Sequence, residues 1–264
     1  MSGARTSTLA TLRGAIERLE AGETRHAVAR VELGHGGADA TLQGGVVRSA
    51  LHEVFAPETR QTASATAFAA GLAWRCAMSR PLLWVRQDFG PGETGALSMG
   101  GLAELGLDPR RIVMVQAADI DMGLRVTADA LACSALGAVV LDVWGGARQF
   151  DSVASRKLTL ASQASGVTCL VLRTAAAPVV STAETRWIVR SARSRTTTAW
   201  SAWGAPQLDV ALVRHRHGQT GQWIMEWMCD ECLFREPSAH SQPAAAAPSY
   251  RPPAPPAVAH RRAG

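Results

Sequence analysis

The segment between Phe55 and the helix pattern that begins at Ala63 is where a phosphate-binding loop would do its chemistry. Such a loop needs glycines that admit a phosphate close to the backbone, a lysine for the β- and γ-phosphates, and a hydroxyl for Mg²⁺. The segment reads Ala56-Pro57-Glu58-Thr59-Arg60-Gln61-Thr62-Ala63, and the single lysine of the chain, Lys157, lies far downstream. We therefore expect a degenerate loop at Ala56, Gln61, Thr62 and Ala63 that binds no nucleotide.

The five cysteines are the next candidates for chemistry. Cys76, Cys133 and Cys169 stand singly in apolar surroundings and are expected to be buried small hydrophobic residues. Cys229-Asp230-Glu231-Cys232 is a C-x-x-C motif, which is compatible with half of a zinc site, a redox pair or an ordinary strand end. A structural zinc site needs four ligands, and only His240 lies nearby, so we expect no metal and no cofactor.

Strands that alternate with helices would position these residues. Apolar runs predict strands at 51–55, 81–86, 112–116, 138–143 and 168–173, and helices at 63–78, 121–134 and 152–165. This alternation indicates right-handed crossovers and a mainly parallel sheet flanked by helices, an α/β fold. Strand patterns at 187–189, 208–214 and 222–227, with a turn at 218–221, predict that the sheet ends in an antiparallel hairpin.

Three units are expected along the chain: 1–48, 49–234 and 235–264. In the first, Leu9, Leu12, Ile16 and Leu19 form one stripe of an amphipathic helix over 6–21, and the glycine-rich stretch 34–45 is expected to be a flexible connection. The last unit is rich in Pro, Ala, Ser and His and predicts a disordered tail, because it cannot bury enough apolar surface to order itself.

The net charge of +5 does not by itself identify a nucleic-acid partner. Arg235, Arg251, Arg261 and Arg262 of the tail contribute much of it, opposed there only by Glu236, so the body is nearly balanced. No apolar run reaches the roughly 20 residues of a membrane span, and the first eleven residues lack the apolar centre of a signal peptide. We expect a cytoplasmic protein with no membrane contact.

Several phrases of the sequence resemble ImuA, the family of RecA-like accessory proteins of bacterial damage-inducible mutagenesis. The resemblance covers roughly residues 6–228. The phrases that carry it are Leu51-His52-Glu53-Val54-Phe55, Pro81-Leu82-Leu83-Trp84-Val85-Arg86-Gln87-Asp88, Gly101-Leu102-Ala103-Glu104-Leu105-Gly106-Leu107-Asp108-Pro109, Ser165-Gly166-Val167-Thr168-Cys169-Leu170-Val171-Leu172-Arg173, Ala183-Glu184-Thr185-Arg186-Trp187 and Arg214-His215-Arg216-His217-Gly218. It implies a RecA-like core over 49–234.

The resemblance also implies roles for individual residues. Asp142 falls at the Walker B aspartate of RecA-like ATPases and Asp88 at the acid that activates water; with no phosphate loop, both would be vestigial. Asp142 could equally cap the turn into Gly145-Gly146, and Asp88 could be an ordinary loop or cap acid. The RecA DNA loops would fall at 144–155 and 174–183, and both are short and poor in charge.

Two further groups of residues are candidates for contacts with other molecules. Arginines with aromatic neighbours can grip and stack single-stranded DNA, which makes Arg186, Trp187, Arg190, Arg193 and Arg195 a candidate DNA contact. A solvated basic face beside a core tryptophan is the alternative. Arg214 and Arg216 fall where RecA reaches a neighbouring subunit's nucleotide, and they are expected to contact an acidic partner. The stripe Leu9, Leu12, Ile16 and Leu19 would dock on a partner or pack within the chain.

The expected function is that of a non-catalytic adaptor in SOS-inducible, error-prone translesion DNA synthesis. The resemblance implies two partners: an ImuB-like Y-family protein without polymerase activity and an error-prone C-family DNA polymerase. A regulator of RecA filaments is the alternative, and direct contact with single-stranded DNA stays open. A residual ATPase ranks lower, because the loss of the phosphate loop argues against it. A cell-division inhibitor also ranks lower, and only the identity of the bound partner would distinguish it from an adaptor.

Overall fold

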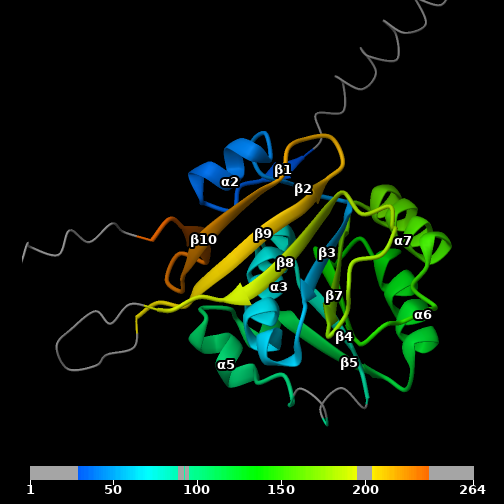
Figure 1. Ribbon diagram of the computed structural model, residues 1–264. Coiled ribbons are helices and arrows are strands. Elements are labelled where there is room, and N and C mark those ends of the chain that lie inside the picture. The colour runs from blue at the N-terminus through cyan, green and yellow to red at the C-terminus, as the bar shows by residue number, and fades with distance from the viewer. Residues whose placement is uncertain (1–28, 89–91, 93–94, 195–203, 238–264) are drawn as a thin grey trace, which may run out of the picture.

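A nine-stranded mixed sheet flanked by helices forms the body of the computed structural model, which describes residues 29–88, 92, 95–194 and 204–237 (Figure 1). The strand order is β11-β10-β9-β8-β3-β7-β6-β4-β5. Six neighbouring strands are parallel: β8 (Thr185–Ser191), β3 (Leu51–Ala56), β7 (Thr168–Thr174), β6 (Ala138–Trp144), β4 (Leu82–Gln87) and β5 (Ile112–Ala117). The predicted mainly parallel sheet is confirmed.

Three antiparallel strands complete the other end of the sheet. They are β9 (Gln207–His215), β10 (Gly221–Met228) and β11 (Leu233–Arg235). The hairpin of β9 and β10 was predicted, whereas β11 was not, because three residues after the C-x-x-C motif carry too short a pattern. β11 ends inside the region where the tail was expected to begin. Of the tail itself, residues 238–264 lie outside the described residues, as does the helix predicted over 6–21.

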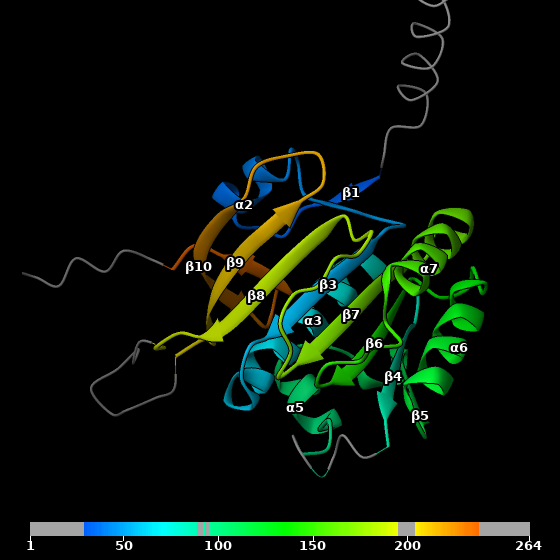
Figure 2. The same ribbon diagram turned by 45° about the vertical axis from the view of Figure 1, so that its right-hand side comes forward.

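Helices cover the two faces of the sheet unequally. Helix α3 (Thr62–Ala77) lies on one face, against β3, β6, β7 and β8. Helices α6 (Ile120–Leu131) and α7 (Ser152–Ser165) lie on the other, where α6 contacts β4, β5 and β6 and α7 contacts β3 and β7 (Figure 2). Asp119 and Asp151 begin α6 and α7 as N-caps, and Gly166 ends α7 in the left-handed region, with φ of 78°.

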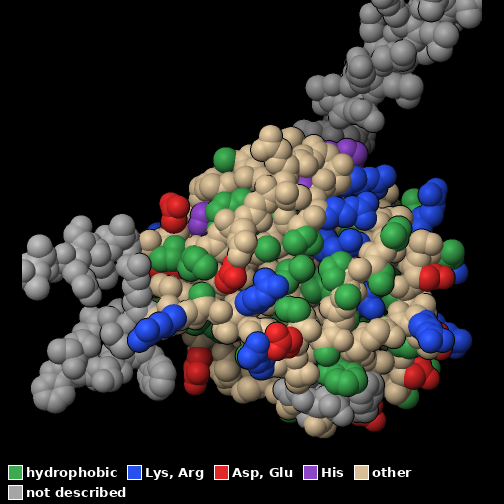
Figure 3. All heavy atoms as spheres, viewed as in Figure 1, with side chains coloured by type: hydrophobic (Ala, Val, Ile, Leu, Met, Phe, Trp, Pro, Cys, Tyr) green, Lys and Arg blue, Asp and Glu red, His purple; other side chains and the backbone are tan. Residues whose placement is uncertain are grey.

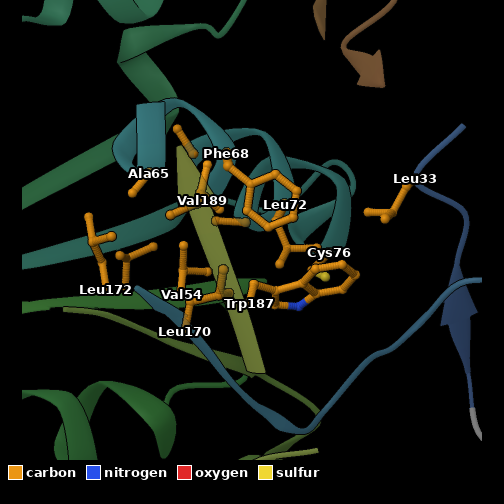
Figure 4. Close-up of a cluster of buried hydrophobic side chains, with 14 of the residues drawn as sticks. Leu33, Val54, Ala65, Phe68, Leu72, Cys76, Leu170, Leu172, Trp187 and Val189 are labelled. Atoms are coloured by element: carbon orange, nitrogen blue, oxygen red, sulfur yellow. The ribbon is translucent and has the colours of Figure 1, made fainter. Parts of the chain in front are cut away.

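The main core lies between α3 and the sheet. Phe68 and Leu72 of α3 pack toward Val54, Leu170 and Trp187 of three neighbouring strands (Figure 4). All six residues of β3 are buried, as expected for a central strand covered on both faces. A second core lies beneath α6 and α7. Cys76 and Cys169 are buried as predicted, but Cys133 is exposed, because it lies just beyond the end of α6.

The glycine-rich stretch 34–45, expected to be a flexible connection, is instead part of an ordered N-terminal unit. This unit consists of β1 (Arg30–Val31), α2 (Gly36–Thr41) and β2 (Val46–Val47). Its residues Leu33, Leu42 and Val46 belong to the main core. Gly45 serves close packing, because a Cβ there would lie 2.3 Å from the carbonyl oxygen of Val31.

Helix α5 (Met99–Glu104) was not among the helices predicted from the sequence. Ser98 begins this helix by accepting a hydrogen bond from the backbone of Gly101. Short 3-10 helices precede α3 and β5: η1 (Thr59–Gln61) and η2 (Pro109–Arg111). None of the helices in the described part of the chain is long and apolar enough to cross a membrane.

Candidate functional site

A cleft of ≈260 Å³ opens at the carboxyl ends of the parallel strands, the edge at which open α/β sheets bind ligands. Thr62, Ala63 and Thr66 from the start of α3 form one wall, and Leu102 and Leu105 of the α5 segment form the opposite wall. Arg86 at the end of β4 and Asp142 of β6 lie at its base. The structure therefore brings three predicted residues, Thr62, Ala63 and Asp142, to one cleft, whereas Asp88 does not line it.

Asp142 is engaged inside the protein. Its Oδ2 lies 3.2 Å from Nε of Arg86 and accepts a 3.4 Å hydrogen bond from Nε1 of Trp84. Burial raises the pKa of Asp142 to about 6, against the lowering effect of Arg86 and Trp84. Asp142 is thus the partner of a buried arginine, and the alternative role as a cap for the Gly145–Gly146 turn is not what its contacts show.

The turn that leads from β3 into α3 uses its own side chains for internal contacts. The Gln61 side chain accepts a 2.6 Å hydrogen bond from the backbone of Ser191, and Thr62 Oγ1 donates to the carbonyl of Thr59 at 2.5 Å. Glu58 and Arg60 form an exposed ion pair of 2.6 Å. No residue from 50 to 77 has a positive φ. The turn therefore lacks the left-handed glycines that shape a phosphate loop.

Asp88, the second acid with an implied vestigial role, is exposed where β4 ends. Its backbone N–H donates to the carbonyl of Ala117 at 2.8 Å, which continues the pairing of β4 with β5. The residues directly after it, 89–91, lie outside the described part of the chain. This placement agrees with an ordinary loop acid.

Arg186 and Arg214, predicted for DNA and for a partner respectively, lie side by side on β8 and β9. Arg186 Nε forms a 2.8 Å ion pair with buried Glu53, and its Nη2 donates to Val179 and Ser181. Arg214 Nη1 donates to the carbonyl of Ser181 at 2.6 Å. Both side chains therefore fasten the loop between β7 and β8, so neither guanidinium is fully available to an external phosphate.

Trp187 cannot stack on a DNA base, and that interpretation is wrong. Its side chain is fully buried, packs on Phe68 at a ring distance of 5.3 Å and donates from Nε1 to Thr185. Alternation along β8 turns Trp187 toward α3 and its neighbours Arg186 and Ile188 toward the opposite face. Arg190 and Arg193 are exposed, while Arg195 lies outside the described residues.

The opposite face of β8, β9 and β10 is left open by α6 and α7 (Figures 1 and 2). Its apolar side chains include Val213 and Ile224, each 42% exposed. The pairing of β8 with β9 shifts register between Arg186 and Trp187, so β9 has one extra residue there. This extra residue is Val213, and its side chain lies on the open face. We call this surface the open sheet face; its residues are Ile188, Arg190, Asp209, Ala211, Val213 and Ile224. Figure 3 shows hydrophobic and basic side chains intermingled over these strands.

Sequence reasoning missed this face, although a signal was present. The inward residues of β9, Leu208, Val210 and Leu212, alternate with Asp209, Ala211 and Val213. An antiparallel strand exposed on one side usually alternates apolar with polar residues, so apolar residues in the outward positions indicate a surface that is covered by something else. Arg216 follows β9 and is exposed in the adjoining turn.

Arg173, at the carboxyl end of β7, is a further residue that sequence reasoning missed. It is 1% exposed and lies between Phe55 and Phe150, with its guanidinium carbon 5.6 and 5.5 Å from the two ring centres. Its Nε and Nη1 have no hydrogen-bond partner among the described residues. Burial lowers the pKa of Arg173, and Glu53 opposes this effect.

Comparison with known proteins gives no family: no family model matches the chain, and no curated protein sequence matches it. Among the described residues, no group of three or more His, Cys, Asp or Glu side chains is placed to hold a metal ion. The cleft, the open sheet face and the sequence phrases are the features of this chain that bear on its function.

Proposed function

We propose that this protein is a non-catalytic, RecA-like adaptor of the ImuA family, acting in SOS-inducible, error-prone translesion DNA synthesis. In this proposal it joins an ImuB-like Y-family protein to an error-prone C-family DNA polymerase. The mostly parallel sheet with an antiparallel end supports the RecA-like assignment, and the sequence phrases quoted above support the family.

One observation carries the non-catalytic part of the proposal: the turn between β3 and α3. A protein that binds a nucleoside triphosphate needs backbone N–H groups and a lysine around the phosphates. Here the turn has no glycine, its Gln61 side chain accepts a hydrogen bond from Ser191, and its one basic residue, Arg60, is paired with Glu58. Asp142, the implied Walker B acid, forms an ion pair with Arg86. These contacts stabilise the fold in the place where an ATPase would hold its substrate.

The open sheet face supports the adaptor part. It combines exposed aliphatic residues with Arg190 and lies beside Arg214 and Arg216, which the resemblance already assigned to a partner. Aliphatic residues do not stack on bases, and the one tryptophan predicted to do so is buried. The face therefore fits a protein better than single-stranded DNA, and we assign it to the ImuB-like protein.

The test is light scattering coupled to gel filtration of the full chain mixed with the ImuB-like protein. The Val213→Asp/Ile224→Asp double variant places two charges on the open sheet face and should abolish a complex that the wild type forms. Val153→Asp/Leu160→Asp is the matched control, because these residues of α7 are equally apolar and 59% and 54% exposed. Circular dichroism confirms that each variant is folded.

A Leu12→Asp/Ile16→Asp variant asks the same question of the predicted N-terminal stripe, which lies outside the described residues. If Val213→Asp/Ile224→Asp and Leu12→Asp/Ile16→Asp both bind the ImuB-like protein normally, the assignment of the interface is wrong. If the wild type forms no complex with the ImuB-like protein but a stable one with RecA, the function is regulation of RecA filaments instead.

A further inference from the structure

The C-x-x-C motif forms the turn between β10 and β11. Its four residues, Cys229 to Cys232, are all turn residues, and the pair Met228 and Leu233 closes the hairpin directly beneath them. The Met228–Leu233 pair makes 229–232 the four loop residues of a tight hairpin, which brings the first and last of them close together. A disulfide requires a Cα separation of roughly 4.4–6.8 Å, so the turn holds the two cysteines at a distance that a disulfide can span.

The backbone conformation of Cys232 directs its thiol toward Cys229. Cys232 has φ of 49°, an unusual value for a residue with a side chain, and its Sγ lies 3.5 Å from the carbonyl oxygen of Cys229. The same sulfur lies 3.3 Å from the carbonyl oxygen of Gly106. The thiol of Cys232 therefore sits over the turn rather than pointing away from it.

Solvent reaches this turn. Both cysteines are half-buried, and Asp230 and Glu231 between them are exposed. Cys76 and Cys169, in contrast, are fully buried, so a dissolved oxidant does not reach their sulfurs in the folded protein. Cys133 is exposed and serves as an internal comparison for non-specific oxidation.

The turn also joins three parts of the molecule. Arg75 of α3 donates from Nη1 to the carbonyl of Cys232 and from Nε to the carbonyl of Glu32 in the N-terminal unit. Gly106, after α5, packs so closely on Cys229 that a Cβ there would lie 1.9 Å from the Cys229 carbonyl oxygen. A covalent link inside the turn would therefore fix the junction of α3, the N-terminal unit and the α5 segment.

We propose that Cys229 and Cys232 form a reversible intramolecular disulfide that locks this junction when the thiol pool becomes oxidising. The oxidant is a low-molecular-weight disulfide such as glutathione disulfide. One cysteine loses its proton and attacks that disulfide, forming a mixed disulfide and releasing one thiol. The second cysteine loses its proton and attacks the protein-bound sulfur, which releases the second thiol. Two protons and two electrons pass to the oxidant, which becomes two thiols.

Burial raises the pKa of both Cys229 and Cys232 above the ordinary thiol value, with Asp230 adding to the rise at Cys229 and Cys229 itself adding to it at Cys232. The attacking species is the thiolate, so the rate of disulfide formation should increase as the pH rises above neutrality. Intracellular disulfides of this accessible type respond to redox conditions rather than persist.

The experiment incubates the full chain in defined ratios of glutathione to glutathione disulfide and counts free thiols after denaturation. Oxidation should lower the count from the five cysteines of the reduced chain to three, and dithiothreitol should restore it. The tryptic peptide that runs from His217 to Arg235 contains both residues and should lose two hydrogens in mass. The unfolding temperature should rise on oxidation in the wild type and in Cys133→Ser, and stay unchanged in Cys229→Ser.

Three results would overturn the proposal: single glutathione adducts on the peptide at every ratio, a disulfide between two chains, or an unmodified peptide when the exposed Cys133 is already oxidised. The peptide mass gives the answer even if Cys229→Ser proves unstable. Because the count and the mass do not depend on any partner, the outcome is independent of the proposed adaptor function.

Discussion

At the scale of single residues, some polar side chains at the centre of the sheet have both of their polar atoms matched inside the protein. His52 is the clearest case, since its side chain is fully buried on β3. Its Nδ1 lies 2.7 Å from Thr185 Oγ1 and its Nε2 lies 2.8 Å from the carbonyl oxygen of Val47. A neutral ring that donates from Nε2 and accepts at Nδ1 satisfies both contacts, so these polar groups serve the fold.

Burial lowers the pKa of His52 to about 4, because the charged ring would lose its hydration. The folded pKa lies below the unfolded value of 6.5, so the unfolded chain binds more protons between these two values. The stability that neutral His52 contributes is complete above pH 6.5 and is lost as the pH falls toward 4. The loss is up to about 3 kcal/mol at roughly 1.4 kcal/mol per pKa unit.

Urea unfolding measured from pH 7 to pH 4 checks this prediction. In His52→Gln the slope of stability against pH should become less positive than in the wild type. Asp142 acts in the opposite direction, since its raised pKa makes stability fall as the pH rises from 3.8 to about 6. The comparison between variants isolates the histidine, and equal slopes in the wild type and His52→Gln would refute the prediction.

At the scale of elements, α3 approaches the antiparallel end of the sheet closely because it carries a glycine. A Cβ on Gly71 would lie 2.6 Å from Cζ3 of Trp227 and 2.9 Å from Cζ of Phe234. The aromatic rings of β10 and β11 therefore occupy the space that any larger residue would need. This contact joins the helix behind the candidate cleft to the hairpin that carries the C-x-x-C turn.

Two effects oppose each other in Gly71→Ala. Alanine favours a helix interior over glycine by about 1 kcal/mol, whereas moving two packed rings costs about 1–3 kcal/mol. Because both rings are in the core, we expect the packing term to win and the variant to lose roughly 1 kcal/mol of unfolding free energy, measured by urea titration. Gly100→Ala in α5 is the control, since its nearest neighbour would be 3.7 Å away, and it should be neutral or stabilising. A stabilised Gly71→Ala would contradict this account.

At the scale of the whole molecule, helices cover the two faces of the sheet unequally. The N-terminal unit, α3 and α5 pack on the first face, and α6 and α7 leave β8, β9 and β10 open on the second. This asymmetry places an apolar surface beside the arginines of β8 and β9. The proposed adaptor function needs such a surface to bind its partner.

The sequence predicts the parallel half of the sheet well, because a strand buried on both faces is rich in consecutive apolar residues, as in residues 138–141 at the start of β6. It predicts the N-terminal unit poorly, because Gly34 and Gly45 have the composition of a flexible stretch while their role is close backbone contact. It also misplaces Arg186 and Trp187. The burial of these residues depends on Glu53 and Phe68, more than 100 positions away, and on which way each residue faces in the sheet.

The most direct test of the central claim is the affinity of the full chain for the ImuB-like protein, measured by titration calorimetry with and without Mg²⁺ and ATP. We expect saturable binding at a defined stoichiometry, with the same dissociation constant in both conditions, because in the proposed function the cleft binds no nucleotide. An affinity that changes tenfold or more with ATP would show that the cleft binds nucleotide, and an absence of binding in both conditions would contradict the adaptor function itself.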